Sequence, residues 1–134
     1  EHRGSIPNEH REGIGEWLFG CDVCQDVCPY NQGSTSNHPP LEAFEPAARW
    51  EDVQLADFLS MDASAFETWA KGSPLKRTKL EGLARNASIV LGNRGNKTSL
   101  RVLEEVSAGH ASEVVREAAA WAFERLSRRL GREE

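Results

Sequence analysis

The run Cys21-Asp-Val-Cys24-Gln-Asp-Val-Cys28-Pro29 lies near the start of this chain, and its spacing decides how that part of the chain is interpreted. It reproduces the last three cysteines of the bacterial ferredoxin motif C-x2-C-x2-C-x3-C-P, whose first cysteine would fall at Leu18. The order of the gaps excludes the radical-SAM pattern, in which the longer gap comes first. The run therefore predicts that Cys21, Cys24 and Cys28 bind [4Fe–4S] iron–sulfur clusters.

Two alternatives for the cysteines remain open, namely a zinc knuckle completed by a histidine such as His10 or His38, and three ordinary thiols. Three thiolates cannot complete one ordinary four-cysteine cluster, and by the ferredoxin rule the third cysteine serves a different cluster from the first two. We therefore expect the missing ligands to come from elsewhere. The chain begins at Glu1 without a methionine, and we interpret it as the C-terminal piece of a longer protein.

The composition is that of a globular domain in a reducing compartment. The chain has 134 residues, which is one-domain length, and no apolar stretch approaches the roughly 18 residues that suggest a membrane span. There is no signal peptide, and three clustered cysteines do not make a disulfide framework. We expect a cytoplasmic, monomeric protein with no membrane partner.

Charge is unevenly distributed along the chain. The net charge is −5, yet residues 71–101 contain eight Lys or Arg and one acid, so this segment is +7 and the remainder is −12. A local basic patch on an acidic protein favours a polyanionic partner. The alternative is a solvated helix face that is balanced by the acidic stretch 42–67.

The expected fold class is mainly α, with a ferredoxin-like [4Fe–4S] cysteine loop segment at residues 1–33 and a HEAT-like helical repeat domain at residues 34–134. A breaker-rich linker separates them, and a short helix is expected over residues 14–19. Asp62 and Ser73-Pro74 have the chemistry of helix starts. Further helices are predicted from Pro74 to Gly92-Asn93, over 97–107, and over 113–129 after the cap Ser112.

An internal repeat supports the helical-repeat interpretation. Arg85-Asn-Ala-Ser-Ile-Val-Leu-Gly92 aligns with Arg116-Glu-Ala-Ala-Ala-Trp-Ala-Phe123 at an offset of 31 residues. Each copy follows a shorter helix and begins with an arginine before small residues that allow close packing. Two-helix repeats of roughly this length are typical of α-solenoids. An ordinary helical bundle is the alternative.

Lys76, Arg77 and Lys79 are expected in the first turns of the helix that begins at Pro74. The helix dipole makes this end unfavourable for cations, while free backbone N–H groups there favour an anion. The three cations therefore predict a phosphate-binding surface, which Arg85 extends unless its place in the repeat gives it a structural role. Aromatic residues do not interleave with these charges, so a folded RNA or a duplex fits better than a single strand.

Three motifs together carry a family resemblance: Glu1-His-Arg-Gly-Ser-Ile-Pro7, Gly20-Cys-Asp-Val-Cys-Gln-Asp-Val-Cys-Pro-Tyr-Asn31 and Leu83-Ala-Arg-Asn-Ala-Ser-Ile-Val-Leu-Gly-Asn93. On these motifs, nearly the whole chain resembles the C-terminal half of the epoxyqueuosine reductases. These are cobalamin-dependent iron–sulfur enzymes of queuosine-tRNA synthesis. The cysteine block is the most specific part of the resemblance.

The resemblance implies two [4Fe–4S] clusters, with Cys21 and Cys24 on one and Cys28 on the other. It also implies that the loop at Asp22 and Val23 lies against cobalamin. The helical repeat domain would bind the tRNA anticodon arm, with Arg3 near the RNA. The implied reaction removes the epoxide oxygen of epoxyqueuosine, with electrons from a donor that the sequence does not identify. Because the chain lacks the N-terminal cobalamin domain, its catalytic acid and the remaining cysteines, we expect the isolated chain to be inactive.

Two other functions compete with this one. The first is a ferredoxin-like electron-transfer module fused to a protein-binding helical repeat, and the second is a zinc-stabilised nucleic-acid adaptor. Reductive dehalogenases share the cluster half but do not explain a basic helical tail. No Ser/His/Asp or paired-carboxylate site is present, the four histidines show no ligand spacing, and Trp50, Trp69 and Trp121 are predicted to be core residues.

Overall fold

The computed structural model describes residues 2–31 and 48–131, and every regular element within these ranges is a helix. The prediction of a mainly α fold is therefore confirmed. The chain divides into two compact units. The helical unit comprises residues 2–19 and 54–131, and the cysteine unit comprises residues 20–31 and 48–53. The predicted boundary at residues 33–34 lies outside the described residues. Residues 2–19, which we had grouped with the cysteine loop, pack within the helical unit.

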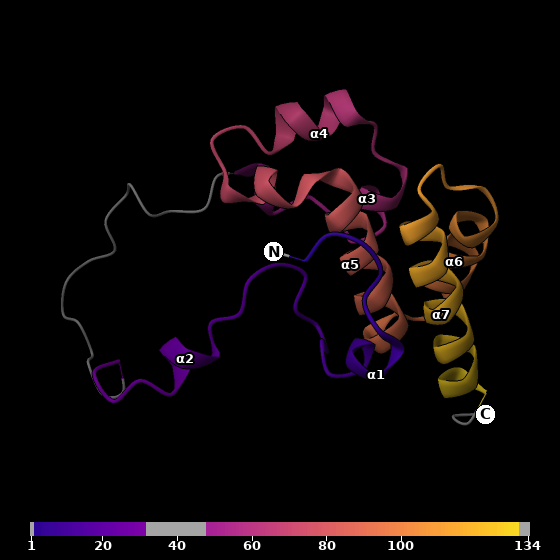
Figure 1. The fold of residues 1–134 in the computed structure, drawn as a ribbon, viewed down its shortest axis with the longest axis horizontal. Helices are drawn as coiled ribbons and strands as arrows, with labels where there is room; N and C mark the ends of the chain where they lie inside the picture. Colours follow the sequence, from indigo (N-terminus) through magenta and orange to yellow (C-terminus); the bar gives the residue numbers. More distant parts are fainter. Residues whose placement is uncertain (1, 32–47, 132–134) are drawn as a thin grey trace. The chain divides into compact units, whose positions relative to one another are not determined.

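The helical unit is built around three long helices, α5 (Lys79–Arg94), α6 (Lys97–Gly109) and α7 (Glu113–Leu130) (Figure 1). Helix α7 packs against both α5 and α6. The shorter elements are α1 (Asn8–Arg11), α3 (Asp57–Ser60), α4 (Ala63–Trp69) and the 3-10 helix η3 (Pro74–Thr78). The cysteine unit contains α2 (Val23–Asp26) and the 3-10 helix η2 (Ala48–Trp50). No helix among the described residues has the length and apolar character needed to cross a membrane.

Side-chain caps set several of the helix starts. Asp62 accepts a hydrogen bond from the Ala65 N–H, and Ser112 accepts one from the Val115 N–H, as their positions predicted. Asn96 caps α6 by accepting from the N–H groups of Thr98 and Ser99. The helices predicted over 97–107 and 113–129 are therefore confirmed.

Two local predictions are wrong. Residues 14–19 form turns, and the helix of this segment is instead α1, which ends at Arg11. The helix expected from Pro74 is two elements, because Pro74–Thr78 is a 3-10 helix and α5 begins at Lys79. Lys79 has φ +58°, a positive value that L-residues rarely adopt. This change of backbone conformation separates the two elements.

The core lies between α5 and α7, where small residues let the two helices approach closely. Its fully buried members include Leu83, Ala87, Val115, Ala122 and Leu126. A Cβ added at Gly92 would lie 2.7 Å from the Ala122 Cα, so only glycine fits there. Trp50, Trp69 and Trp121 are half-buried rather than core residues, since each keeps part of its ring exposed at the edge of its unit.

Candidate functional site

The cysteine loop is organised around the single turn of α2. Gly20, with φ +70°, turns the chain immediately before Cys21, and a side chain there would be strained. Cys24 lies within α2, and Cys28 follows it by one turn. Cys21 and Cys24 are exposed, Cys28 is half-buried, and all three are free thiols. The loop therefore exposes two of its three cysteines to solvent.

Two of the neighbours in the cysteine motif close this loop. The Asn31 side-chain amide donates to the backbone carbonyl of Gln25 and to its side-chain oxygen, both at 3.0 Å. The Asn31 N–H also donates to the Cys28 carbonyl at 2.9 Å. Large apolar side chains on the same loop are exposed, namely Val23 (47%), Val27 (63%) and Tyr30 (91%). The loop thus has an ordered backbone and an uncovered apolar surface.

The three thiols fit iron–sulfur chemistry but make an incomplete ligand set. Soft thiolate ligands suit iron–sulfur clusters, and one ordinary cluster requires four of them. Within residues 2–31 and 48–131, no three His, Cys, Asp or Glu side chains converge so that they could hold one metal ion. His10 lies on α1 in the helical unit, and His38 lies outside the described residues. The zinc alternative therefore stays a prediction.

The segment 2–19, called the strap below, is held by polar side chains of α5. Arg85 is buried and donates from one guanidinium nitrogen to the carbonyls of His2 (3.1 Å) and Gly4 (2.6 Å). Asn86 donates to the Leu18 carbonyl at 2.9 Å. Asn93 donates to the carbonyls of Arg11 and Gly15, both at 3.0 Å. Burial lowers the pKa of Arg85 from its ordinary value.

Helix α7 holds the same strap through ion pairs. Arg11, which is 2% exposed, donates to the Glu117 carboxylate, and the Ser5 hydroxyl donates to the other oxygen of that carboxylate. The Arg11 guanidinium also lies 5.7 Å from the centre of the Trp121 ring. Hydrogen bonds from Ser5 and then Arg11 lower the pKa of Glu117, and Arg125 lowers the pKa of Glu12.

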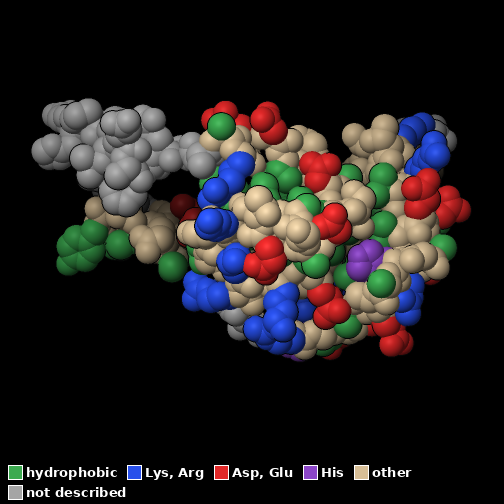
Figure 2. All heavy atoms as spheres, turned by 90° about the horizontal axis from the view of Figure 1, so that it is seen from above, with side chains coloured by type: hydrophobic (Ala, Val, Ile, Leu, Met, Phe, Trp, Pro, Cys, Tyr) green, Lys and Arg blue, Asp and Glu red, His purple; other side chains and the backbone are tan. Residues whose placement is uncertain are grey.

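The predicted phosphate-binding cations lie on η3 and at the first residue of α5. Figure 2 shows Lys and Arg side chains gathered on one face of the helical unit, with Asp and Glu among them. The Lys76 ammonium lies 2.6 Å from the Glu67 carboxylate, and both side chains are largely exposed. This pair matches the alternative in which the acidic stretch 42–67 balances the basic residues. Lys79 is exposed.

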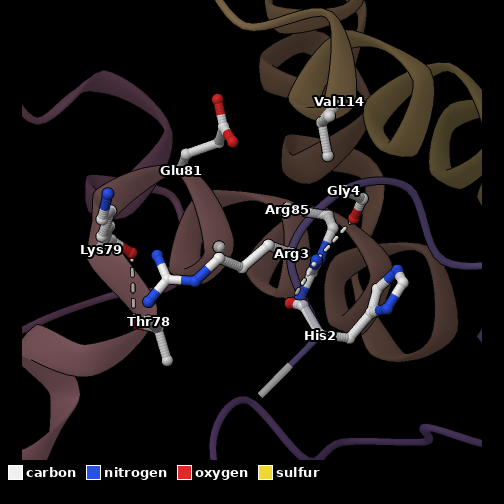
Figure 3. A pocket seen from close by; sticks show the side chains of 9 residues that line it. His2, Arg3, Gly4, Thr78, Lys79, Glu81, Arg85 and Val114 are labelled. Carbon is white, nitrogen blue, oxygen red and sulfur yellow. Dashed lines mark hydrogen bonds between the residues drawn. The ribbon is translucent and has the colours of Figure 1, made fainter.

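A small pocket of about 130 Å³ brings together residues that are far apart in the sequence (Figure 3). Arg3 reaches it from the strap, and its guanidinium donates to the Arg77 carbonyl at 3.4 Å. The pocket is lined by His2, Arg3, Gly4, Thr78, Lys79, Glu81, Gly82, Arg85 and Val114. Four of these side chains are basic and one is acidic, so the arrangement suits an anion.

The cysteine segment matches a known family model. A model described as a 4Fe-4S double cluster binding domain matches residues 1–31. Epoxyqueuosine reductase from Pseudomonas aeruginosa is 38% identical over 93% of this chain, which corresponds to 34% of that protein. The one from Alicycliphilus denitrificans is 35% identical over 92% of this chain and 36% of its own length. The chain thus spans about a third of the relatives that it matches.

Solved structures agree with the sequence matches. A crystal structure of epoxyqueuosine reductase with an epoxyqueuosine-modified tRNA-Tyr stem loop has a TM-score of 0.81 and 28% identity to this chain, covering 93% of it and 33% of that structure. A structure of the Bacillus subtilis enzyme gives a TM-score of 0.79 at 29% identity, with the same coverage. Over this third, the chain matches the epoxyqueuosine reductase family. The resemblance inferred from its sequence is confirmed.

The epoxyqueuosine reductase motifs now have structural roles within this chain. Gly20, Gln25 and Asn31 shape the cysteine loop, while Arg85, Asn86 and Asn93 of the third motif bind the strap that contains the first. The predicted cluster, cobalamin and tRNA contacts themselves stay predictions.

Sequence reasoning missed the ion pair that holds the strap, between the buried Arg11 and the exposed Glu117. Arg11 lies in a segment without helical periodicity, and 106 residues separate it from Glu117. The only local signal is Glu117 itself, an acid that follows Arg116 in an otherwise alanine-rich stretch.

Proposed function

We propose that this chain is part of an epoxyqueuosine reductase that reduces epoxyqueuosine to queuosine in tRNA with cobalamin and two [4Fe–4S] clusters. The match in sequence and fold over 93% of the chain carries the proposal. The reaction consumes two electrons and two protons, replaces the epoxide with a C=C bond and releases water. When bound, the cofactors would supply those electrons, which come from an external electron donor. The chain spans about a third of the relatives that it matches, so the proposal concerns the activity of the full-length protein.

In this proposal the cysteine loop supplies cluster ligands, with Cys21 and Cys24 on one cluster and Cys28 on the other. The match of residues 1–31 to a double cluster binding domain supports two clusters. Asp22 and Val23 would lie against cobalamin, and both are exposed on the loop, as such a contact requires. The apolar surface of Val23, Val27 and Tyr30 suits burial against the remainder of the parent protein.

The helical unit would bind the anticodon arm of tRNA through Arg3, Lys76, Arg77 and Lys79. The related structure that contains a tRNA stem loop supports this role. The exposed Lys76–Glu67 pair does not prevent it, because such pairs stabilise by only about 0–1 kcal/mol and exchange readily for a phosphate. Arg85 contributes by holding the strap. The protein would act as a cytoplasmic monomer.

We further propose that the helical unit is a HEAT-like repeat pair. Both arginines that the sequence repeat aligns donate hydrogen bonds to backbone carbonyls. Arg116 donates to the carbonyls of His110 (2.6 Å) and Ala111 (3.1 Å), which directly precede its own helix, whereas Arg85 donates to those of His2 and Gly4 in the strap. Each arginine thus fixes a segment against the first half of its helix.

The cluster assignment is tested with single Cys→Ser variants of the full-length protein. Cys21→Ser and Cys24→Ser should damage one cluster and Cys28→Ser the other, as measured by iron content and electron paramagnetic resonance. Loss of the same cluster in all three variants would refute the two-cluster assignment. Zinc in place of iron in the native protein would instead favour the zinc-stabilised adaptor.

The RNA assignment is tested by replacing Lys76, Arg77 and Lys79 with alanine together. Each lost phosphate contact should reduce the slope of log affinity against log salt by about 0.7–0.9. Stability should change little, because loss of the Lys76–Glu67 pair offsets the relief of repulsion between neighbouring cations. An unchanged salt slope would mean that these residues do not contact phosphates and belong to a solvated helix face, the alternative given above. Native protein without salt-dependent tRNA binding would favour the alternative, an electron-transfer module fused to a protein-binding repeat.

A further inference from the structure

We infer that Arg3 and Lys79 bind one and the same backbone phosphate of a nucleic acid at the pocket in Figure 3, and that Arg85 is the positioning residue for Arg3. The inference rests on the proposed tRNA binding. Arg3 and Lys79 would contact the phosphate directly. Arg85 would not contact it and would instead hold the backbone on both sides of Arg3.

Arg85 fixes the backbone on both sides of Arg3. The same guanidinium nitrogen donates to the carbonyl of His2, which precedes Arg3, and to that of Gly4, which follows it. Gly4 adopts φ +108°, which turns the chain so that both carbonyls reach this nitrogen. Arg85 is only 6% exposed, and its remaining nitrogens donate to the Asn86 side chain. Four of its five N–H donors are therefore committed to the protein.

Arg3 itself is exposed and directed toward Lys79. Its guanidinium donates to the Arg77 carbonyl, two residues before Lys79, and in Figure 3 it lies beside Thr78 and the backbone of Lys79. The backbone of Lys79 has a positive φ (+58°), and its carbonyl accepts a hydrogen bond from the Thr78 hydroxyl. Two exposed cations from segments 76 residues apart thus line one concave surface.

A phosphate group suits this arrangement. The planar guanidinium of Arg3 can donate two parallel hydrogen bonds to a phosphate, while Lys79 supplies a point charge. Glu81 is the one acid in the lining, and its carboxylate points away from Arg3 in Figure 3. Glu81 weakens attraction for any anion, so a free phosphate would bind poorly. A nucleic acid gains further contacts along its backbone and overcomes that weakness.

The test is a double-mutant cycle in the full-length protein, with the epoxyqueuosine-modified tRNA stem loop as the ligand. If Arg3 and Lys79 share one phosphate, Arg3→Ala plus Lys79→Ala should lower the salt slope by about 0.7–0.9 in total. The two single effects on affinity should then be non-additive. A total loss of about 1.4–1.8 with additive affinities would mean two separate phosphates and would overturn the inference.

The cycle includes controls for charge and ligand. Arg101→Ala removes a cation that is paired with Glu105 on α6, and should leave the salt slope unchanged. Glu81→Gln should tighten binding, and weaker binding would contradict the placement of the anion. Inorganic phosphate should compete only weakly, whereas tight binding of it would assign the pocket to a free anion. If the wild-type protein showed no salt-dependent binding, the proposed function itself would be refuted. If the wild type bound the stem loop but the two substitutions acted additively, only the shared phosphate would be refuted.

The positioning role of Arg85 is tested with Arg85→Lys in two backgrounds. In the native background tRNA binding should weaken, whereas in the Arg3→Ala background it should not weaken further. A purely structural role would give equal losses in both. Should Arg85→Lys fail to fold, Gly4→Ala perturbs the same peptide, because alanine is strained at φ +108° although nothing obstructs its Cβ. Equal losses of affinity in both backgrounds would overturn the assignment.

Discussion

Gly92 illustrates how one residue sets the distance between two helices. An added Cβ would lie 2.7 Å from the Ala122 Cα, which belongs to the backbone of α7 and cannot rotate away. We expect Gly92→Ala to destabilise the protein by about 1–3 kcal/mol, the usual cost of overpacking a core. Chemical denaturation followed by circular dichroism measures this.

Gly82 provides the matched control for that experiment, since it lies on the same helix. A Cβ at Gly82 would meet only the Thr78 Cβ at 3.5 Å, an ordinary contact. Gly82→Ala should therefore stabilise the protein by about 0.4–1 kcal/mol through the lower entropy of the unfolded chain. If both variants lost stability equally, the close contact with α7 would not be the cause.

Glu117 is the residue whose charge state should matter most for the strap. Hydrogen bonds from Ser5 and Arg11 lower its pKa below the ordinary value of 4.5. A carboxyl group with a lowered folded-state pKa contributes stability above its ordinary pKa and loses it as pH falls through the lowered value. Glu117→Gln should therefore differ from wild type most at neutral pH, and the difference should shrink on acidification. Denaturation at several pH values tests this, and a difference that is constant with pH would contradict it.

At the scale of elements, α5 acts as a ladder of donors for the strap. Its polar residues bind five strap carbonyls, and this explains why Leu83–Asn93 keeps polar residues on a helix that is otherwise buried. Because the acceptors are backbone carbonyls, the strap is held whatever its side chains are.

Asn93→Ala tests this ladder. The variant leaves the carbonyls of Arg11 and Gly15 without their donor, and such losses cost about 1–3 kcal/mol. Hydrogen exchange of the strap should also accelerate. Asn96→Ala is the control, because removing the α6 cap costs a similar ~0.5–2 kcal/mol without touching the strap. Unchanged strap exchange in Asn93→Ala would contradict the ladder.

At the scale of the whole chain, the charge distribution has two uses. Within residues 71–101, Arg85 binds backbone carbonyls, and three further cations lie beside carboxylates, namely Lys76, Arg94 and Arg101, whereas Lys79 is exposed at the pocket. The +7 of residues 71–101 therefore overstates the charge available to a partner. This bears directly on salt-slope measurements, which count only the cations that meet phosphates.

The sequence by itself determined what depends on nearby residues. Cysteine spacing indicated the iron–sulfur motif, and Asp62 and Ser112 marked helix starts, because a cap needs only the next three residues. The apolar periodicity predicted a helix over residues 113–129, where α7 lies. These features follow from local geometry, so a linear pattern records them.

Only the tertiary structure decided which polar groups meet across the chain. The sequence left open whether Arg85 extends the phosphate-binding surface or has a structural role, and it is buried because the strap, more than 80 residues earlier, supplies its acceptors. Arg11 pairs with Glu117 across 106 positions, and Arg3 reaches the pocket beside Lys79 in the same way. No local rule encodes such contacts, because the energy that selects them comes from packing the strap onto α5 and α7 after those helices have formed.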